Sequence, residues 1–204
     1  MLVGLGVALY DRGAYGQAAE RLCHASDLDP LDPTPYLFMG KIQTIEMSEP
    51  AGMGERLERF ARLRPENALA NYYYAVSVWK QRKGPEDAAT SARVESLLQK
   101  AVHLDPKLGP ACLQLGILYA ERKDWPQAIR SYQEATKVSP DLEEAHYRLA
   151  QAYRQTGEQM KAEQELQMHA RIKKETAEKA ERERREIQEF VYTLQGRDRT
   201  SPQL

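Results

Sequence analysis

Residues 111 to 140 read ACLQLGILYAERKDWPQAIRSYQEATKVSP and set the pattern for the chain. A Leu-Gly pair at 115 and 116 is followed by small and aromatic residues at fixed intervals and by a closing proline, Pro140. That proline lies 34 residues after Pro106. A series that returns at such a period indicates a repeat protein, in which each unit is one supersecondary element that buries its apolar face against its neighbours.

This series resembles the tetratricopeptide repeat (TPR), whose signature is an aromatic residue, Leu-Gly, Tyr, Ala, an aromatic residue and Pro over about 34 residues. The residues that carry the resemblance in this unit are Leu115, Gly116, Tyr119, Trp125, Ala128, Tyr132, Ala135 and Pro140. The resemblance, which is to the bacterial type of TPR protein, implies an all-α fold. We expect an α-solenoid of about five TPR helix hairpins, followed by a long C-terminal helix.

The same template covers residues 1–170 with differing fidelity. The expected repeats span about residues 1–32, 33–66, 67–108, 109–142 and 143–170. The first repeat lacks only the opening residues of its first helix, which suggests a fragment of a longer chain. The second repeat has lost the usual Gly-aromatic pair in its turn, TIEMSEPAGMG, and the third is stretched around KQRKGPEDAATS.

Small residues and prolines recur at positions that matter for helix packing. Gly or Ala at 6, 40, 75, 116 and 150 is expected to let the two helices of each repeat approach closely. Gly13 and Gly157 fit the left-handed position that ends a helix. Prolines at 30, 65, 106 and 140 are expected to stop each second helix, because proline cannot continue one.

The stretch NYYYAVSVWK, residues 71 to 80, has large aromatic residues on more than one face of a helix. Asn71, Tyr74, Ala75 and Val78 share one face and are expected to pack inside the repeat. The neighbouring stripe of each first helix lines the concave, peptide-binding surface in the TPR family, so the resemblance implies a largely apolar groove. Its expected residues are Leu37, Phe38, Lys41, Tyr72, Tyr73, Val76, Trp79, Leu113, Ile117, Tyr147, Arg148 and Arg154, with Val3, Val7 and Tyr10 continuing it in the first repeat. The alternative is that these aromatic residues pack against the next repeat.

One subclass of TPR domains holds the C-terminal carboxylate of chaperone peptides with lysine, asparagine and arginine on the first helices. The equivalent positions here are Val3, Val7, Phe38, Leu69 and Tyr73. None of them carries the required side chain, so a chaperone carboxylate clamp is not expected.

Residues 171–195 are expected to form a charged extension of the last helix. Opposite charges lie four residues apart at several places, for example Arg171 and Glu175, and such pairs stabilise an exposed helix. Its amphipathic end consists of Ile187, Phe190, Val191 and Leu194. We expect this end to dock on the chain's own groove, a second copy or a partner, although broken heptads disfavour a long coiled coil. Residues 196–204 are expected to be disordered.

Composition excludes several classes of function. The formal net charge of −1 disfavours nucleic-acid binding, and no apolar run is long enough for a transmembrane helix, so no membrane partner is expected. The first residues make a poor signal peptide, which leaves the localisation cytoplasmic or, if a leader has been removed, exported. Cys23 and Cys112 lie too far apart in sequence for a CxxC site.

No motif for catalysis, a cofactor or a metal occurs in the sequence. The four histidines are scattered over different repeats, and His146 and His169 stand where the family has packing residues. We therefore predict a non-enzymatic scaffold whose partner is a protein or peptide, bound extended or as a helix. The alternatives are a homo-oligomeric module, dimeric through the C-terminal helix, and an accessory domain of a larger enzyme or exported protein.

Overall fold

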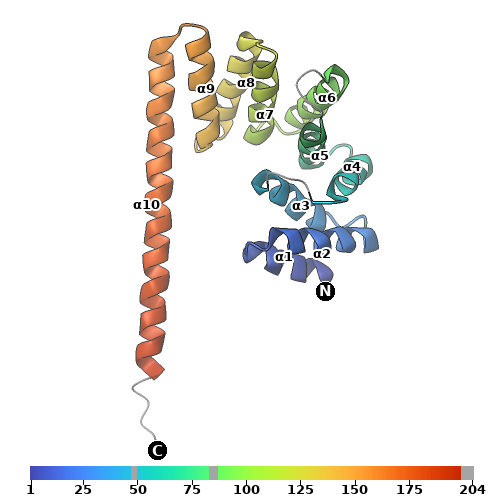
Figure 1. Cartoon of the computed structure of the whole chain (residues 1–204), viewed down its shortest axis with the longest axis vertical. Helices are drawn as coiled ribbons and strands as arrows, with labels where there is room; N and C mark the ends of the chain where they lie inside the picture. Colours follow the sequence, from blue (N-terminus) through green and yellow to red (C-terminus); the bar gives the residue numbers. More distant parts are fainter. Residues whose placement is uncertain (47–49, 83–86, 199–204) are drawn as a thin grey trace, which may run out of the picture. The chain divides into compact units, whose positions relative to one another are not determined.

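The computed structural model describes residues 1–46, 50–82 and 87–198, with side chains up to residue 190. Within these residues the chain has ten α-helices and no strand (Figure 1). The helices are α1 (Leu2–Asp11), α2 (Tyr15–Leu28), α3 (Thr34–Ile45), α4 (Met53–Leu63), α5 (Ala68–Gln81), α6 (Ala88–Leu104), α7 (Gly109–Glu121), α8 (Trp125–Val138), α9 (Glu143–Gln155) and α10 (Gln159–Asp198). The all-α fold of helix hairpins followed by a long C-terminal helix is confirmed.

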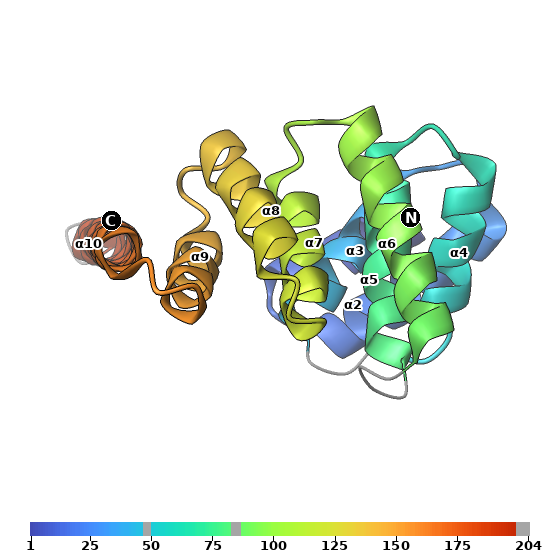
Figure 2. The same ribbon diagram turned by 90° about the horizontal axis from the view of Figure 1, so that it is seen from above.

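The helices pack as consecutive hairpins in two compact units. The first unit, residues 1–142, holds four hairpins in which α1 packs on α2, α3 on α4, α5 on α6 and α7 on α8. Figure 2 shows α5 beside α6 and α7 beside α8. First helices of neighbouring repeats also touch, α1 with α3 and α3 with α5. The second unit begins at Glu143 and consists of the hairpin of α9 and α10.

The closing prolines act as the sequence predicts. The helices α2, α4, α6 and α8 end at Leu28, Leu63, Leu104 and Val138, in each case two residues before a closing proline. The residue before proline is disfavoured in the α region, so the helix ends there and the chain is free to begin the next repeat. Each second helix therefore ends at an equivalent place.

The turn inside the first, fourth and fifth repeats has one geometry. Ala14, Asp124 and Glu158 donate their backbone N–H groups to the carbonyls five residues earlier, each at 2.9 Å. Gly13 and Gly157 have φ of 75° and 79° in this turn, which confirms the left-handed prediction. The fourth repeat has Lys123 at the same position with φ of 58°, a conformation that costs a residue with a Cβ about 1 to 2 kcal/mol.

Glycines allow close approach between helices, but not always within one repeat. A Cβ on Gly6 would lie 2.8 Å from Leu22, and one on Gly116 would lie 2.3 Å from the Tyr132 ring, so both face the other helix of their hairpin. Gly40 differs, because its nearest neighbour is the ring of Tyr73 on α5, in the next repeat. At Gly40 the closest approach is therefore to the next repeat, which the sequence does not predict.

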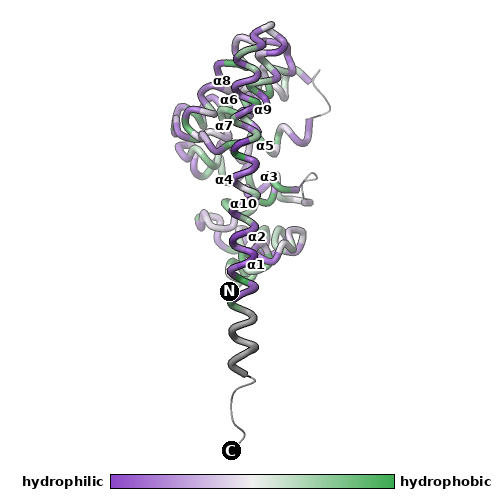
Figure 3. The backbone as a smooth tube through the Cα atoms, turned by 90° about the vertical axis from the view of Figure 1, so that its left-hand side faces the viewer, coloured by the Kyte–Doolittle hydropathy of each residue, from purple (hydrophilic) through white to green (hydrophobic). Residues whose placement is uncertain are grey.

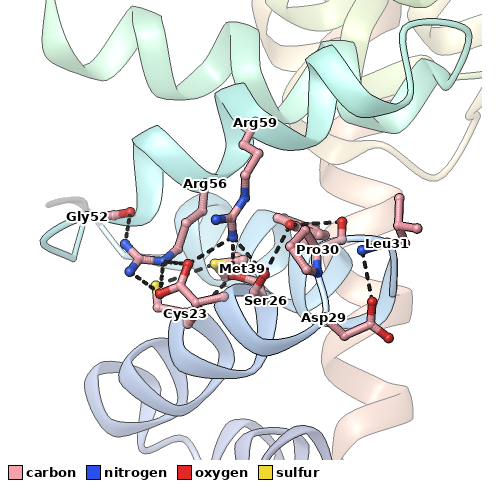
Figure 4. A network of polar contacts seen from close by, with 11 residues as sticks. Cys23, Ser26, Asp29, Pro30, Leu31, Met39, Gly52, Arg56 and Arg59 are labelled. Carbon is pink, nitrogen blue, oxygen red and sulfur yellow. Dashed lines mark hydrogen bonds and ion pairs between the residues drawn. The ribbon is translucent and has the colours of Figure 1, made fainter.

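A polar network joins the second helices of the first two repeats (Figure 4). Asp27 at the end of α2 pairs with Arg56 at 2.5 Å and with Arg59 at 3.0 Å, both on α4. Arg59 also donates to the carbonyl of Ser26 at 2.7 Å, and Arg56 donates to the carbonyl of Gly52 at 2.6 Å. The hydrogen bond from Arg56 lowers the pKa of Asp27, partial burial opposes that shift, and Arg59 lowers the pKa further.

The helix α10 continues without a break from the fifth repeat into the charged extension. Its first part packs on α9, where Ala162 and Ile172 are buried, and every described side chain from 173 to 190 is exposed. Three of the predicted pairs form there, Arg171 with Glu175, Lys174 with Glu178 and Lys179 with Glu183, at 3.7, 3.9 and 4.0 Å. Figure 3 shows the hydrophilic colour of this stretch. Residues 199–204 of the predicted tail lie outside the described residues.

Candidate protein-interaction surface

The three consecutive tyrosines of α5 are all buried. Tyr72, Tyr73 and Tyr74 are 8 %, 7 % and 8 % exposed, and Val76 is buried with them. Seven consecutive residues of this helix, from 71 to 77, are buried, because α5 is enclosed by α3, α4 and α6. Tyr72, Tyr73 and Val76, which were expected in an open groove, are therefore covered by the chain itself.

Tyr73 connects the second and third repeats. Its ring covers Gly40 of α3, and its backbone carbonyl accepts a hydrogen bond of 2.7 Å from the side-chain amide of Gln43. Burial raises the pKa of the Tyr73 phenol. These contacts fit the alternative derived from the sequence, in which an aromatic residue of the first helix packs against a neighbouring repeat.

Tyr74 lies on the inner face that the sequence predicts. Its hydroxyl donates to the Glu58 carboxylate of α4 at 2.9 Å and also contacts Arg93 of α6. Burial, with the hydrogen bond to Glu58, raises the pKa of Tyr74 to about 12. The phenol is therefore a neutral hydrogen-bond donor that links three helices.

Trp79, expected as a groove anchor, is half-buried under an arginine. The guanidinium of Arg82 lies 3.4 Å from the centre of the Trp79 ring and pairs with Glu121 of the fourth repeat through two contacts of 2.6 Å. Next to it, Lys80 donates to the backbone carbonyls of Gln43 and Glu46 at the C-terminal end of α3. A cation stabilises the negative end of a helix dipole, so these residues hold the ends of the first helices together.

A partly open aromatic cluster belongs to the first two repeats. Phe38 of α3 lies 5.2 Å from Tyr10 of α1, edge to face, and Tyr10 lies 5.5 Å from Tyr15. The ammonium of Lys41 stands 4.8 Å from the centre of the Phe38 ring. The three rings and Leu37 are half-buried and Lys41 is exposed. Tyr15 is not among the residues predicted for the groove, because the sequence does not show that it reaches Tyr10.

The remaining predicted groove residues divide between the two units. Leu113 is buried and Ile117 half-buried on α7. On α9, Tyr147 is 41 % exposed, and the centre of its ring lies 5.4 Å from that of His169. Arg148 pairs with Glu144 at 3.1 Å. Arg154 is exposed. The predicted docking residues Ile187 and Phe190 are exposed, and the side chains of Val191 and Leu194 lie outside the described residues.

Comparison with known proteins agrees with this geometry. A family model described as TPR repeat matches residues 116–157. Residues 116–157 therefore form a tetratricopeptide repeat, and the hairpins around them share its all-α fold. No curated protein sequence matches it significantly.

Solved structures share this fold. TTC0263, a thermophilic TPR protein of Thermus thermophilus, is 20% identical, with a TM-score of 0.63 over 85% of this chain and 96% of its own. A MamA structure is 19% identical, with a TM-score of 0.61 over 85% and 96% of the two chains. PilF of Pseudomonas aeruginosa is 19% identical, with a TM-score of 0.67 over 83% and 74%. TPR folds are protein-interaction scaffolds and are typically non-enzymatic.

The chain also has a polar cavity of about 820 Å³ in its first unit. Side chains of α4, α5 and α6 line it, among them Glu55, Glu58, Lys80 and Arg93. None of the predicted groove residues does so. Arg93 is paired with Glu58 at 3.1 Å, and Lys80 donates to backbone carbonyls of α3, so neither cation is committed to a ligand in the cavity.

The histidines of the fifth repeat serve packing. His146 is buried with Nδ1 2.6 Å from the Glu165 carboxylate, and Nδ1 of His169 lies 3.5 Å from Glu143. Both pairs join α9 to α10. Across residues 1–46, 50–82 and 87–190, no three His, Cys, Asp or Glu side chains are grouped to hold a metal ion. The described helices include none that is both long and apolar enough to cross a membrane.

Proposed function

We propose that this TPR protein binds a protein partner through a peptide segment, extended or helical, that rests on the first helices of its first two repeats. The binding face consists of Tyr10, Tyr15, Leu37, Phe38 and Lys41. The observation that carries the proposal is the half-exposed Tyr10 and Phe38 pair with Lys41 beside it, since rings left partly open on a scaffold offer both apolar contact area and a fixed geometry.

The chemistry of this face suggests the kind of segment it accepts. An apolar side chain packed against the exposed faces of the Phe38 and Tyr10 rings would gain roughly 1.5 to 3 kcal/mol if fully buried. Lys41 is exposed and lies within reach of a carboxylate on the same segment. We therefore expect peptides with one large apolar anchor and an acidic residue next to it.

The test is selection from a random peptide library on the immobilised protein, followed by measurement of Kd for a selected peptide. Phe38→Ala should weaken binding at least tenfold and Lys41→Ala several-fold, and Tyr147→Ala, on the separate second unit, serves as the matched control. Equal affinity of the wild-type protein and Phe38→Ala would overturn this proposal. Circular dichroism of each variant shows that loss of binding is not loss of fold.

The second candidate function is a homo-oligomeric module. It is supported by Ile187 and Phe190, each 64 % exposed on α10. Large apolar side chains in a row at a helix end tend to mark an interaction site. It requires no partner other than a second copy of the chain.

A further inference from the structure

The surface of α10 that packs on α9 continues along the exposed half of the same helix. Steps of three or four residues keep a position on one face of a helix, and such steps join Ala162, Glu165, His169 and Ile172, which lie against α9. The same steps continue the stripe through Thr176, Ala180, Glu183, Ile187 and Phe190. All five of these later side chains are exposed.

The charge beside this exposed stripe changes along its length. Lys173 and Lys179 flank its beginning, Glu183 and Glu186 lie on or beside its later part, and Arg184 flanks that later part on the other side. Small residues, Thr176 and Ala180, come before the large ones. A face that is basic with small residues at one end, and mainly acidic with large residues at the other, is complementary to itself when it is turned end to end.

We propose that residues 173–190 of two copies pair in antiparallel orientation along this stripe. The pairing places Thr176 level with Ile187 of the other copy and Ala180 level with Glu183. Lys173 then covers the Phe190 ring of the other copy, with its charge free to reach solvent. Each contact occurs twice because the two copies are related by a twofold axis.

The same register brings Lys179 of one copy near Glu186 of the other. Two such pairs flank the contact, one at each side of its centre, and they set orientation as flanking charges do between paired helices. A parallel pairing is disfavoured, because it would place Glu183 against Glu183 and Lys179 near Arg184. The large side chains Ile187 and Phe190 would then also meet without the small residues that make room for them.

The length of the paired segment sets the strength expected of the contact. Eighteen residues of helix span about 27 Å at 1.5 Å per residue. One face of that length buries less than the ~1,600 Å² of a standard interface. The dimer is therefore concentration-dependent, and dilution releases monomers.

The test is sedimentation equilibrium of the full chain over a concentration series. The wild-type chain should approach twice its monomer mass of 23.3 kDa as concentration rises. Phe190→Asp should weaken association at least tenfold, while Arg185→Glu, on the opposite face of the helix, should leave it within twofold. A wild-type chain that stays monomeric at all concentrations overturns the proposal, as does a dimer that Phe190→Asp leaves intact.

Charge reversal tests the orientation. Lys179→Glu alone and Glu186→Lys alone should each weaken association about three- to tenfold, because each creates two like-charge contacts. The double variant Lys179→Glu with Glu186→Lys should restore it. A double variant that is weaker than both single variants overturns the antiparallel register. Dimer formation in these experiments does not depend on peptide binding by the first two repeats, because those repeats belong to the other unit.

Discussion

Gly40 of α3 and Tyr73 of α5 lie so close that a Cβ on Gly40 would fall 2.4 Å from the Tyr73 ring. This contact joins the first helices of the second and third repeats, and the carbonyl of Tyr73 accepts the Gln43 amide beside it. The ring packs on Gly40, and the hydrogen bond from Gln43 holds the backbone of Tyr73 at the same place. Tyr73 thus holds neighbouring repeats together.

Gly40→Ala should destabilise the chain by about 1 to 3 kcal/mol, because the added methyl group overpacks the Tyr73 ring. The matched control is Gly4→Ala in α1, where a Cβ meets nothing within 4 Å. Alanine is the better helix former, so the control should gain up to about 1 kcal/mol. Urea unfolding followed by circular dichroism gives the change in the free energy of unfolding for each substitution. Equal changes for Gly40→Ala and Gly4→Ala would show that the contact between Gly40 and Tyr73 does not limit the size of residue 40.

Lys123→Gly should stabilise the fold by about 1 kcal/mol. Lys123 has a positive φ in a turn where the first and fifth repeats have glycine, and glycine adopts this conformation without steric cost. Lys123→Ala, which keeps the Cβ, should give no such gain, and Gly157→Ala should lose about 1 kcal/mol. If Lys123→Gly and Lys123→Ala change the thermal stability by the same amount, relief of backbone strain does not explain the change.

Asp27→Asn should destabilise the chain at neutral pH by about 0.5 to 1 kcal/mol through its contacts with Arg56 and Arg59. The pKa of Asp27 is lowered in the folded state, so its contribution is present above the unfolded pKa of about 3.9 and is lost as pH falls through the folded value. The gap in stability between the wild-type chain and Asp27→Asn should therefore close in acid. Asp11→Asn, on the exposed end of α1, is the control for loss of a surface carboxylate and should change stability little at neutral pH.

Both thiols should react slowly in the folded chain. Cys23 and Cys112 are 7 % and 2 % exposed, and burial raises the pKa of Cys112 to about 11. The reactive thiolate of Cys112 is therefore both scarce and covered at pH 8. Labelling with a thiol-specific disulfide reagent should be at least a hundredfold slower in buffer than in denaturant, and fast labelling of both thiols in buffer would contradict the burial.

The repeat fold could be predicted from sequence because its determinants are local. The period of 34 residues, the closing prolines and the glycines of the turns act within a few residues of their own position, and the helices begin and end accordingly. The helical period also predicts correctly that Tyr74 faces inward.

The burial of Tyr72, Tyr73 and Val76 on α5 could not be predicted from the helical period. Helical spacing shows which residues share a face but not how much of that face the neighbouring repeats cover. Tyr73 is covered because residue 40 is a glycine on another helix, and Trp79 is capped by Arg82, which Glu121 of a later repeat holds in place. These contacts depend on residues 33 and 39 positions away, and no local signal marks them.

The measurement that tests the central claim most directly is a calorimetric titration of one selected peptide into Phe38→Ala and Tyr73→Ala, with urea unfolding of both variants. Our account predicts that Phe38→Ala loses at least tenfold in affinity and little stability, because its ring is half-exposed. Tyr73→Ala should lose several kcal/mol of stability, since it removes a buried ring. Unchanged affinity in Phe38→Ala, together with a stable Tyr73→Ala that no longer binds, would place the binding surface on α5 and contradict the account.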